Sequence, residues 1–469
     1  MEARSRTVPL LPAGITVVIG ALLLGAYQQG AYHQTQHQLF AVLVGVGGLL
    51  LLAESQVRSA LPRVLVIAAP LVGSTVVSTA LSDDRSDAGS TFLLLALLVV
   101  GLLAGIATPA PRRDTVLWAI VAVAVLVAAT AIWGVAAQSS PWGRVTEGVW
   151  RGSSSLTYSN AAAAIIGPVS LITFIKAARE DHRGLAVATV FLTVGFTSTQ
   201  SRGGALALLI VLPFVVGHLG LRRFALAALP VGVGVAIGVP LLLARASTTT
   251  TAVPVLVSAL IAIGLAATAG LWSIRSRIPR PEVSLLAISV AAVGAIALSP
   301  LGDRLTQRLT LRSGTTAGGE DAGVLFGDRA QEWTVAWAEF REQPLFGHGP
   351  GVVDLAWVED GTGFRAMFVH NEYLELAVTH GIVGLLALLA TAGLLGRHLR
   401  RSEHTVPLAI AIGMFLLHST VDFLWHLPLL PVLFAAVIGL WMNYSTQEHP
   451  GPVIAESQAD SMDQPAHSL

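Results

Sequence analysis

Residues 115–136 read TVLWAIVAVAVLVAATAIWGVA, a run of 22 positions without a charged side chain. A helix needs about 20 consecutive apolar residues to cross the hydrocarbon core of a bilayer, so this run is long enough to span it. Similar blocks recur along the chain, which is 54% hydrophobic and only 12% charged. Soluble domains carry roughly 25% charged residues, so the composition excludes a water-soluble globule.

These blocks predict an all-α polytopic membrane bundle of about 12 to 14 transmembrane helices. The first block is too long for a signal peptide and lacks a cleavage site of small residues, so we interpret it as a retained helix. The expected helices cover approximately residues 9–27, 39–53, 64–81, 91–107, 115–136, 160–175, 185–196, 203–216, 224–243, 253–273, 283–298, 373–395, 407–421 and 429–442.

The basic residues alternate between the two ends of these helices. Most of the 28 lysines and arginines lie in short loops on one side, for example Arg112, Arg113 and Arg397. Cytoplasmic loops carry the excess of basic residues, so we place this side and both termini in the cytoplasm. The expected location is the inner (cytoplasmic) membrane, which the chain crosses many times.

The longest polar stretch, residues 300–372, falls on the extracytoplasmic side as one large loop. Long loops in compact proteins are usually functional. Its middle, residues 313–323, is rich in Gly and Thr and is expected to be mobile. Residues 328–342 place large apolar side chains among charges at a spacing that predicts an amphipathic helix at the membrane interface.

The composition also excludes several classes of function. The formal net charge is zero, which indicates no nucleic-acid partner. There is no Cys, so thiolate nucleophiles, disulfides and thiolate metal sites are excluded. No predicted helix carries Asp, Glu, Lys or Arg near its centre, whereas ion-coupled transporters commonly need ionisable groups there. These features favour chemistry at one membrane surface.

Polar patches on the extracytoplasmic side contain four phrases, TQSRGG at 199–204, PLFGHGPG at 344–351, HNEYLE at 370–375 followed by GIVG at 381–384, and HSTVDFLWH at 418–426. Together they resemble the conserved pattern of the O-antigen ligase and polymerase superfamily. Their order and their placement on one side make the combination specific. The resemblance covers residues 197–428. Four helices are predicted between the first phrase and the large loop, more than the family pattern has, so either the pair at 253–298 is an insertion or the count is wrong.

The resemblance implies a GT-C-like bundle and a metal-independent inverting glycosyltransferase without a cofactor. The implied donor is a glycan on an undecaprenyl-diphosphate carrier, and the acceptor is a hydroxyl of a lipid, a glycan or a protein. Ligation, polymerisation and protein glycosylation remain open. In such proteins two arginines bind the diphosphate and a histidine lies at the reaction centre, and the matching positions here are Arg202, Arg329 and His370.

The chemistry of these residue types agrees with that reading. Guanidinium groups stay charged and bind a diphosphate leaving group bidentately, so converging arginines can replace a divalent cation. A histidine of near-neutral pKa can accept the proton of the acceptor hydroxyl. The alternatives are an interfacial anchor for Arg202, a helix-surface ion pair of Arg329 with Asp328 or Glu332, and a backbone-satisfied side chain for His370.

Further residues are expected around this centre. His418, Asp422 and His426 are spaced four apart, which predicts one shared helix face. A hydrogen-bonded network is favoured there over a metal site, because a third well-placed ligand is not evident, and we expect no metal. The expected substrate contacts are Arg151, Tyr158, Asn160, Asn371, Arg304 and Arg308, and the expected supporting residues are Glu372, His418, Asp422 and His426.

Three glycines, Gly347, Gly349 and Gly351, could either cradle a phosphate or form a tight turn. The turn is favoured because no strand precedes them. The chain is expected to divide into N-terminal transmembrane helices (1–196), an O-antigen ligase-like domain (197–442) and a disordered cytoplasmic tail (443–469). The rival functional classes are a transporter of a small anion or of the lipid-linked glycan, and a non-catalytic envelope scaffold.

Overall fold

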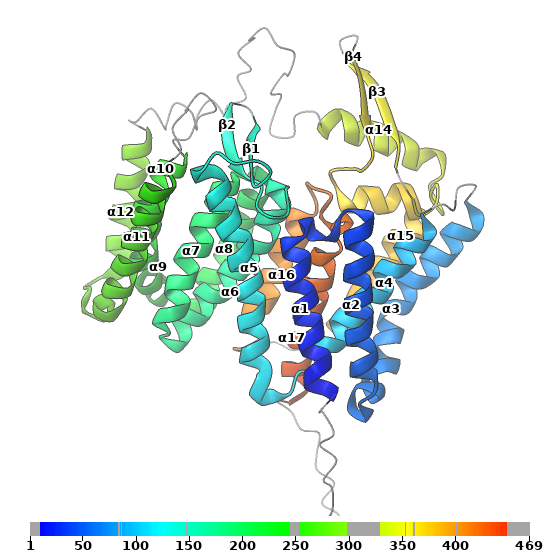
Figure 1. Cartoon of the computed structure of the whole chain (residues 1–469), viewed down its shortest axis with the longest axis horizontal. Coiled ribbons are helices and arrows are strands. Elements are labelled where there is room, and N and C mark those ends of the chain that lie inside the picture. Colours follow the sequence, from blue (N-terminus) through cyan, green and yellow to red (C-terminus); the bar gives the residue numbers. More distant parts are fainter. Residues whose placement is uncertain are drawn as a thin grey trace, which may run out of the picture.

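The computed structural model describes residues 10–82, 85, 87–146, 148–243, 253–297, 329–351, 353–359, 362–399 and 402–447. Helices make up most of this part of the chain (Figure 1). The α-helices before the large loop are α1 (Leu10–Tyr27), α2 (Gln34–Leu52), α3 (Ser55–Leu81), α4 (Ala88–Ile106), α5 (Arg113–Ala136), α6 (Ser159–Glu180), α7 (Arg183–Thr199), α8 (Arg202–Leu219), α9 (Leu221–Gly238), α10 (Pro240–Leu243), α11 (Pro254–Ile274) and α12 (Pro281–Ala297). The later ones are α14 (Arg329–Glu342), α15 (Glu372–Gly396), α16 (Val406–His418) and α17 (Leu429–Gln447).

The predicted all-α polytopic membrane bundle is confirmed. Within the described residues, ten helices are long and apolar enough to cross a membrane. Four shorter apolar helices, α7, α12, α16 and α17, coincide with the other predicted blocks. Helix α3 begins at Ser55, before the predicted block at 64, so Arg58 and Arg63 lie within a helix and not in a loop. Helix α17 continues to Gln447, past the expected domain boundary at 442, and residues 448–469 of the expected tail lie outside the described residues.

The centre of the bundle is formed by helices that are apolar all round. Helix α6 is buried along almost its entire length, as expected for a helix surrounded by other helices. Helices α4 and α17 pack closely because glycines bring their backbones together. A Cβ atom at Gly105 would lie 2.2 Å from the carbonyl oxygen of Ala436, and one at Gly439 would lie 2.2 Å from that of Leu102.

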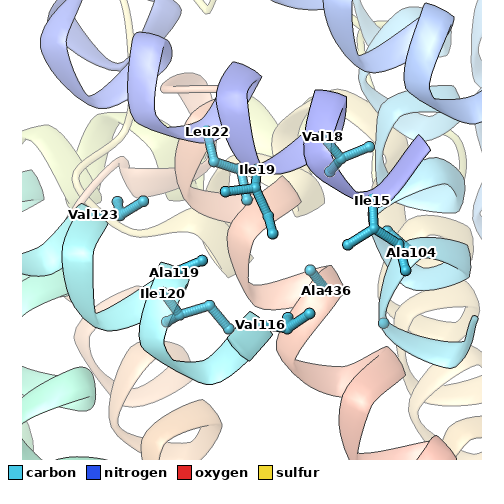
Figure 2. A pocket seen from close by; sticks show the side chains of 11 residues that line it. Ile15, Val18, Ile19, Leu22, Ala104, Val116, Ala119, Ile120, Val123 and Ala436 are labelled. Carbon is cyan, nitrogen blue, oxygen red and sulfur yellow. The ribbon is translucent and has the colours of Figure 1, made fainter. Parts of the chain in front are cut away.

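A small cavity lies between α1, α4, α5 and α17 (Figure 2). Its volume is about 20 Å³ and every residue that lines it is apolar, including Ile15, Leu22, Val116 and Val123. A water molecule needs two to four polar partners, and this cavity offers none from side chains. It is a packing defect of the core and not a site for chemistry.

The polar elements gather at one end of the bundle (Figure 1). They are two antiparallel hairpins, β1 (Gly143–Thr146) with β2 (Val149–Gly152) and β3 (Leu355–Glu359) with β4 (Thr362–Ala366), together with α14. Helix α14 confirms the helix predicted at 328–342, and it packs on α15 and β3 through a second, small apolar core. The sequence did not predict either hairpin. The expected mobile segment at 313–323 lies outside the described residues.

Helix α15 is broken at Gly381, where φ is 64° and ψ is −162°. The chain at 344–349 fills the break with backbone hydrogen bonds, which satisfy groups that a continuous helix would pair internally. These bonds run from His348 N to Val378 O (2.9 Å), Gly349 N to Thr379 O (2.9 Å), Ile382 N to Pro344 O (2.9 Å) and Val383 N to Leu345 O (3.2 Å). Two of the family phrases are therefore interlocked.

Glycines are required where these two segments touch. Gly347 has a φ of 68°, and a Cβ atom there would lie 2.4 Å from the carbonyl oxygen of Thr379. A Cβ atom at Gly381 would lie 2.4 Å from the carbonyl oxygen of Leu345. The N–H groups of Gly347, His348 and Gly349 all donate to backbone carbonyls. The glycine cluster is thus a turn, as predicted, and its N–H groups are not arranged to cradle a phosphate.

Candidate functional site

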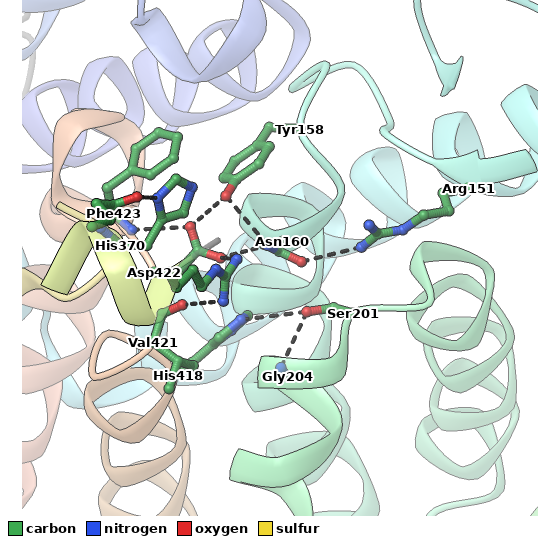
Figure 3. Close-up of polar contacts among 12 residues, drawn as sticks. Arg151, Tyr158, Asn160, Ser201, Gly204, His370, His418, Val421, Asp422 and Phe423 are labelled. Carbon is green, nitrogen blue, oxygen red and sulfur yellow. Dashed lines mark hydrogen bonds and ion pairs between the residues drawn. The ribbon is translucent and has the colours of Figure 1, made fainter. Parts of the chain in front are cut away.

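The candidate site is organised around Asp422, whose side chain is fully buried (Figure 3). Its carboxylate accepts hydrogen bonds from the Tyr158 hydroxyl, from the Asn160 amide and from the backbone N–H of Phe423. A nitrogen of the Arg329 guanidinium lies 3.2 Å from the carboxylate Oδ2. The start of α6, the start of α14 and the turn after α16 therefore meet at one carboxylate.

The hydroxyl of Tyr158 acts as a donor in this cluster. Burial, followed by the charge of Asp422, raises the pKa of Tyr158 well above its ordinary value. The phenol therefore stays protonated at any physiological pH and donates to the Asp422 carboxylate. Its ring stacks on Phe423 with the centroids 5.0 Å apart.

Arg329 is the first residue of α14 and is held by two bonds. One guanidinium nitrogen pairs with Asp422 and another donates to the backbone carbonyl of Val421. The side chain remains about 25% exposed, so Arg329 lies at the edge of the cluster. The alternative for this residue was a helix-surface pair with Asp328 or Glu332. Asp328 lies outside the described residues, and the carboxylate that Arg329 pairs with among the described residues is Asp422.

His370 lies beside the same cluster. Its Nδ1 is 2.8 Å from the Glu332 carboxylate, and its ring lies nearly perpendicular to that of Phe423 with the centroids 4.8 Å apart. The backbone carbonyl of His370 accepts a hydrogen bond from the Trp333 indole at 3.2 Å. The side chain is 28% exposed, so it is not sealed in the core.

Arg202 opens α8 next to the end of α16. Ser201 caps the helix by accepting from Gly204 N at 3.1 Å, and its Oγ lies 3.4 Å from His418 Nε2. A Cβ atom at Gly203 would lie 3.1 Å from the His418 ring, which shows how closely the two helix ends approach. The Arg202 side chain is exposed at this junction.

The remaining predicted contacts fall into three groups. Arg151, on β2, donates to Thr199 O at 3.0 Å and to the Asn160 side chain at 3.3 Å, so it connects the hairpin to the cluster. The side-chain oxygen of Asn371 caps α15 by accepting from Tyr373 N and Leu374 N, both at 3.1 Å. Arg304 and Arg308 lie outside the described residues.

The prediction that His418, Asp422 and His426 share one helix face is wrong. Helix α16 ends at His418, Asp422 lies in the following turn, and His426 ends the 3-10 helix η4 (Leu424–His426). Ser419 and Thr420 hydroxyls bond back to carbonyls of the preceding turn, a local pattern that competes with helix continuation. His418 and Asp422 face the cluster, whereas His426 pairs with Glu375 at 2.5 Å.

Glu372, Glu375 and His426 bring three possible metal-ligand atoms within 4.8 Å of one another. Hydrogen-bond donors of the protein already bind these two carboxylates. The N–H of Trp425 donates to Glu372, the N–H of Val369 donates to Glu375 at 2.9 Å, and His426 contacts Glu375. The set joins the start of α15 to the segment after α16. A second set, Glu339, Glu342 and His348, lies at the surface end of α14.

Sequence reasoning missed Glu332 and Phe423, which both contact His370. The spacing of Arg329 and Glu332, three residues apart on an amphipathic helix, is a signal that places both on one face. The pairing of Phe423 with His370 joins segments more than fifty residues apart, and no local pattern indicates it.

The fold and the cluster define a multi-pass membrane protein with a polar, arginine- and histidine-containing site at one end of its helices. Residues 248–389 match the family model described as O-Antigen ligase. The match covers less than half of the chain and supports the predicted relationship to the O-antigen ligase and polymerase superfamily. It also supports, in general terms, an enzyme of the glycosyltransferase type. The matched stretch includes Arg329 and His370, whereas Arg202 lies outside it. No curated protein gives a significant match to the chain.

Proposed function

We propose that this protein transfers a glycan from an undecaprenyl-diphosphate carrier to an acceptor hydroxyl at the outer face of the cytoplasmic membrane, with inversion and without a metal. The observation that carries the proposal is the meeting of Arg329 and His370 at the Asp422 cluster, with Arg202 at the adjoining helix end. The donor is held on the arginine side and the acceptor on the histidine side.

The cluster pre-orients Arg329 for an anionic leaving group. Asp422 and the Val421 carbonyl fix the orientation of the guanidinium, and the side chain remains about 25% exposed. Charge grows on the diphosphate as its bond to the sugar breaks, and donors that are already oriented stabilise this charge without reorganisation. Arg202 supplies a second positive charge that a divalent cation would otherwise provide.

His370 acts as the general base in this proposal. Its Nδ1 faces Glu332, which leaves Nε2 as the nitrogen available to an acceptor hydroxyl. The acceptor oxygen bonds to the anomeric carbon while the bond between that carbon and the diphosphate oxygen breaks. The proton passes to Nε2, and the bonding electrons leave with the diphosphate.

We assign the lipid part of the donor to an apolar groove. Its volume is about 670 Å³, and residues of α8, α15, α16 and α17 line it. The groove extends along α16 from Thr405 and Trp441 to Leu417 and Thr420. Thr420 directly precedes Val421, whose carbonyl binds Arg329. A polyprenyl tail in the groove therefore brings its diphosphate to the arginine.

The experiment is release of free undecaprenyl diphosphate by the purified protein in nanodiscs, supplied with lipid-diphosphate glycan and candidate acceptors. His370→Ala, Arg202→Ala and Arg329→Lys are expected to lower the rate by on the order of 10²–10³-fold. Lysine is chosen for Arg329 because alanine would leave Asp422 buried without a counter-charge. EDTA is expected to leave the wild-type rate unchanged.

The matched control is Arg365→Ala. Arg365 lies on β4, is exposed and pairs with Asp354, away from the cluster. It is expected to release diphosphate at the wild-type rate. Wild-type release in all three site variants would overturn the proposal, and substrate crossing vesicles without any release would favour a transporter instead.

A further inference from the structure

Glu332 is a buried carboxylate on the inner face of α14. It is 4% exposed, although α14 itself lies at the surface end of the bundle. Both of its oxygens face one residue: Oε2 lies 2.8 Å from His370 Nδ1, and Oε1 accepts from the backbone N–H of His370. The carboxylate therefore contacts both the ring and the backbone N–H of His370.

Helix α14 holds His370 from a second side as well. The indole of Trp333, the next residue, donates to the His370 carbonyl at 3.2 Å. The Phe423 ring packs against the imidazole at nearly a right angle. The position of His370 is thus set by consecutive residues of one helix, and that helix also begins with Arg329.

The charge of Glu332 needs a partner. A buried carboxylate is costly unless it is paired and hydrogen-bonded. Among the ion pairs of the described residues, Glu332 takes part in the one with His370, whereas Arg329, one turn earlier, pairs with Asp422. Arg329 and Glu332 are therefore committed to different partners.

We propose that Glu332 is a positioning residue that holds the proton of His370 on Nδ1 and so keeps Nε2 free as the base. This inference rests on the proposed function, in which His370 accepts the acceptor proton. When Nε2 takes that proton, the Glu332 carboxylate stabilises the imidazolium, and the proton then leaves to water. A carboxylate that orients a catalytic histidine in this way is known to matter by about 10⁴-fold in serine proteases.

The variants are Glu332→Gln, Glu332→Asp and His370→Ala, with Glu339→Gln as the matched control. Glu339 lies on the same helix two turns later and contacts His348. The readouts are kcat and donor KM for lipid-diphosphate release in nanodiscs, together with the thermal unfolding temperature. Glu332→Gln is expected to lower kcat by on the order of 10²–10⁴-fold with donor KM within about threefold. Glu332→Asp recovers part of the loss, and Glu339→Gln behaves as wild type.

Three outcomes overturn the inference. If Glu332→Gln keeps wild-type kcat while His370→Ala is inactive, His370 acts without Glu332 and only this inference fails. If Glu332→Gln only lowers the unfolding temperature and the folded fraction keeps wild-type kcat, Glu332 is merely structural. If His370→Ala keeps wild-type kcat, the proposed function fails together with it.

Discussion

At the scale of single residues, Asp422 decides how the candidate site is arranged. It is fully buried, and its four partners come from three separate parts of the chain. Breaking a buried ion pair from one side costs about 3–5 kcal/mol, because the remaining charge stays unpaired. Asp422 and Arg329 therefore fix each other, and the arginine is oriented before any ligand arrives.

His426 gives a prediction for the dependence of stability on pH. Burial alone lowers its pKa, but the charge and hydrogen bond of Glu375 and the charge of Glu372 outweigh burial and raise the pKa to about 9. This value is above that of the unfolded chain, about 6.5. Protonated His426 therefore stabilises the fold fully below pH of about 6.5, and the contribution is lost as pH rises through about 9.

The measurement is the thermal unfolding temperature of wild type and His426→Gln across this range. Between a pH of about 7 and 10, the free energy of unfolding of wild type is expected to fall by up to about 3 kcal/mol more than that of the variant, and its unfolding temperature falls accordingly. His33→Gln, at an exposed histidine, serves as the control and is expected to follow wild type. Parallel curves for wild type and His426→Gln would contradict the assignment.

Most of the candidate site could be predicted from the sequence, because its residues lie in recognisable phrases. Arg329 and His370 were expected, and so were Tyr158, Asn160 and Asp422, although what each residue does in the reaction remains a proposal. The pairings were not predictable. Asp422 meets Tyr158 across more than 260 residues, and Glu332 meets His370 across 38. Local spacing carries no information about such contacts.

At the scale of elements, the break in α15 explains two of the phrases physically. The chain at 344–349 and the helix at 378–383 exchange backbone hydrogen bonds, and glycines at 347 and 381 allow the approach. The first part of α15 begins just after His370, and the chain at 344–349 begins just after α14. The interlock therefore ties together the two elements that carry His370 and Glu332.

Gly381→Ala tests this interlock. The positive φ costs about 1–3 kcal/mol for a residue with a side chain, and the clash with the backbone at Leu345 adds a similar amount. We expect a lower thermal unfolding temperature and slower diphosphate release. Gly393→Ala is the control, since it lies on the same helix with nothing within 4 Å of its Cβ position. Equal behaviour of the two variants would show that the interlock does not stabilise the fold.

The elements differ in how well the sequence indicates them. The apolar blocks predicted the helices because bilayer thickness fixes the length of a run, and the amphipathic spacing predicted α14. The four-residue strands β1 and β2 are too short for a periodic signal, and the break at Gly381 depends on a distant segment. The end of α16 was misplaced because the four-residue spacing of polar groups continues past its last turn.

At the scale of the whole molecule, one helix links the apolar groove to the polar cluster. Helix α16 lines the groove for most of its length and ends at His418 beside the Arg202 turn. A donor with a long apolar tail and a doubly charged head matches this combination. A small anion would use the cluster and leave the groove without a role.

The most direct test of the proposed site is a structure of the protein in nanodiscs with the lipid-diphosphate glycan bound. We predict that the tail lies along α16 in the groove and that the diphosphate contacts the guanidinium groups of Arg202 and Arg329. The first sugar is then expected beside Nε2 of His370. A diphosphate at the opposite end of α16, near Thr405, or one that contacts neither arginine, would contradict the account.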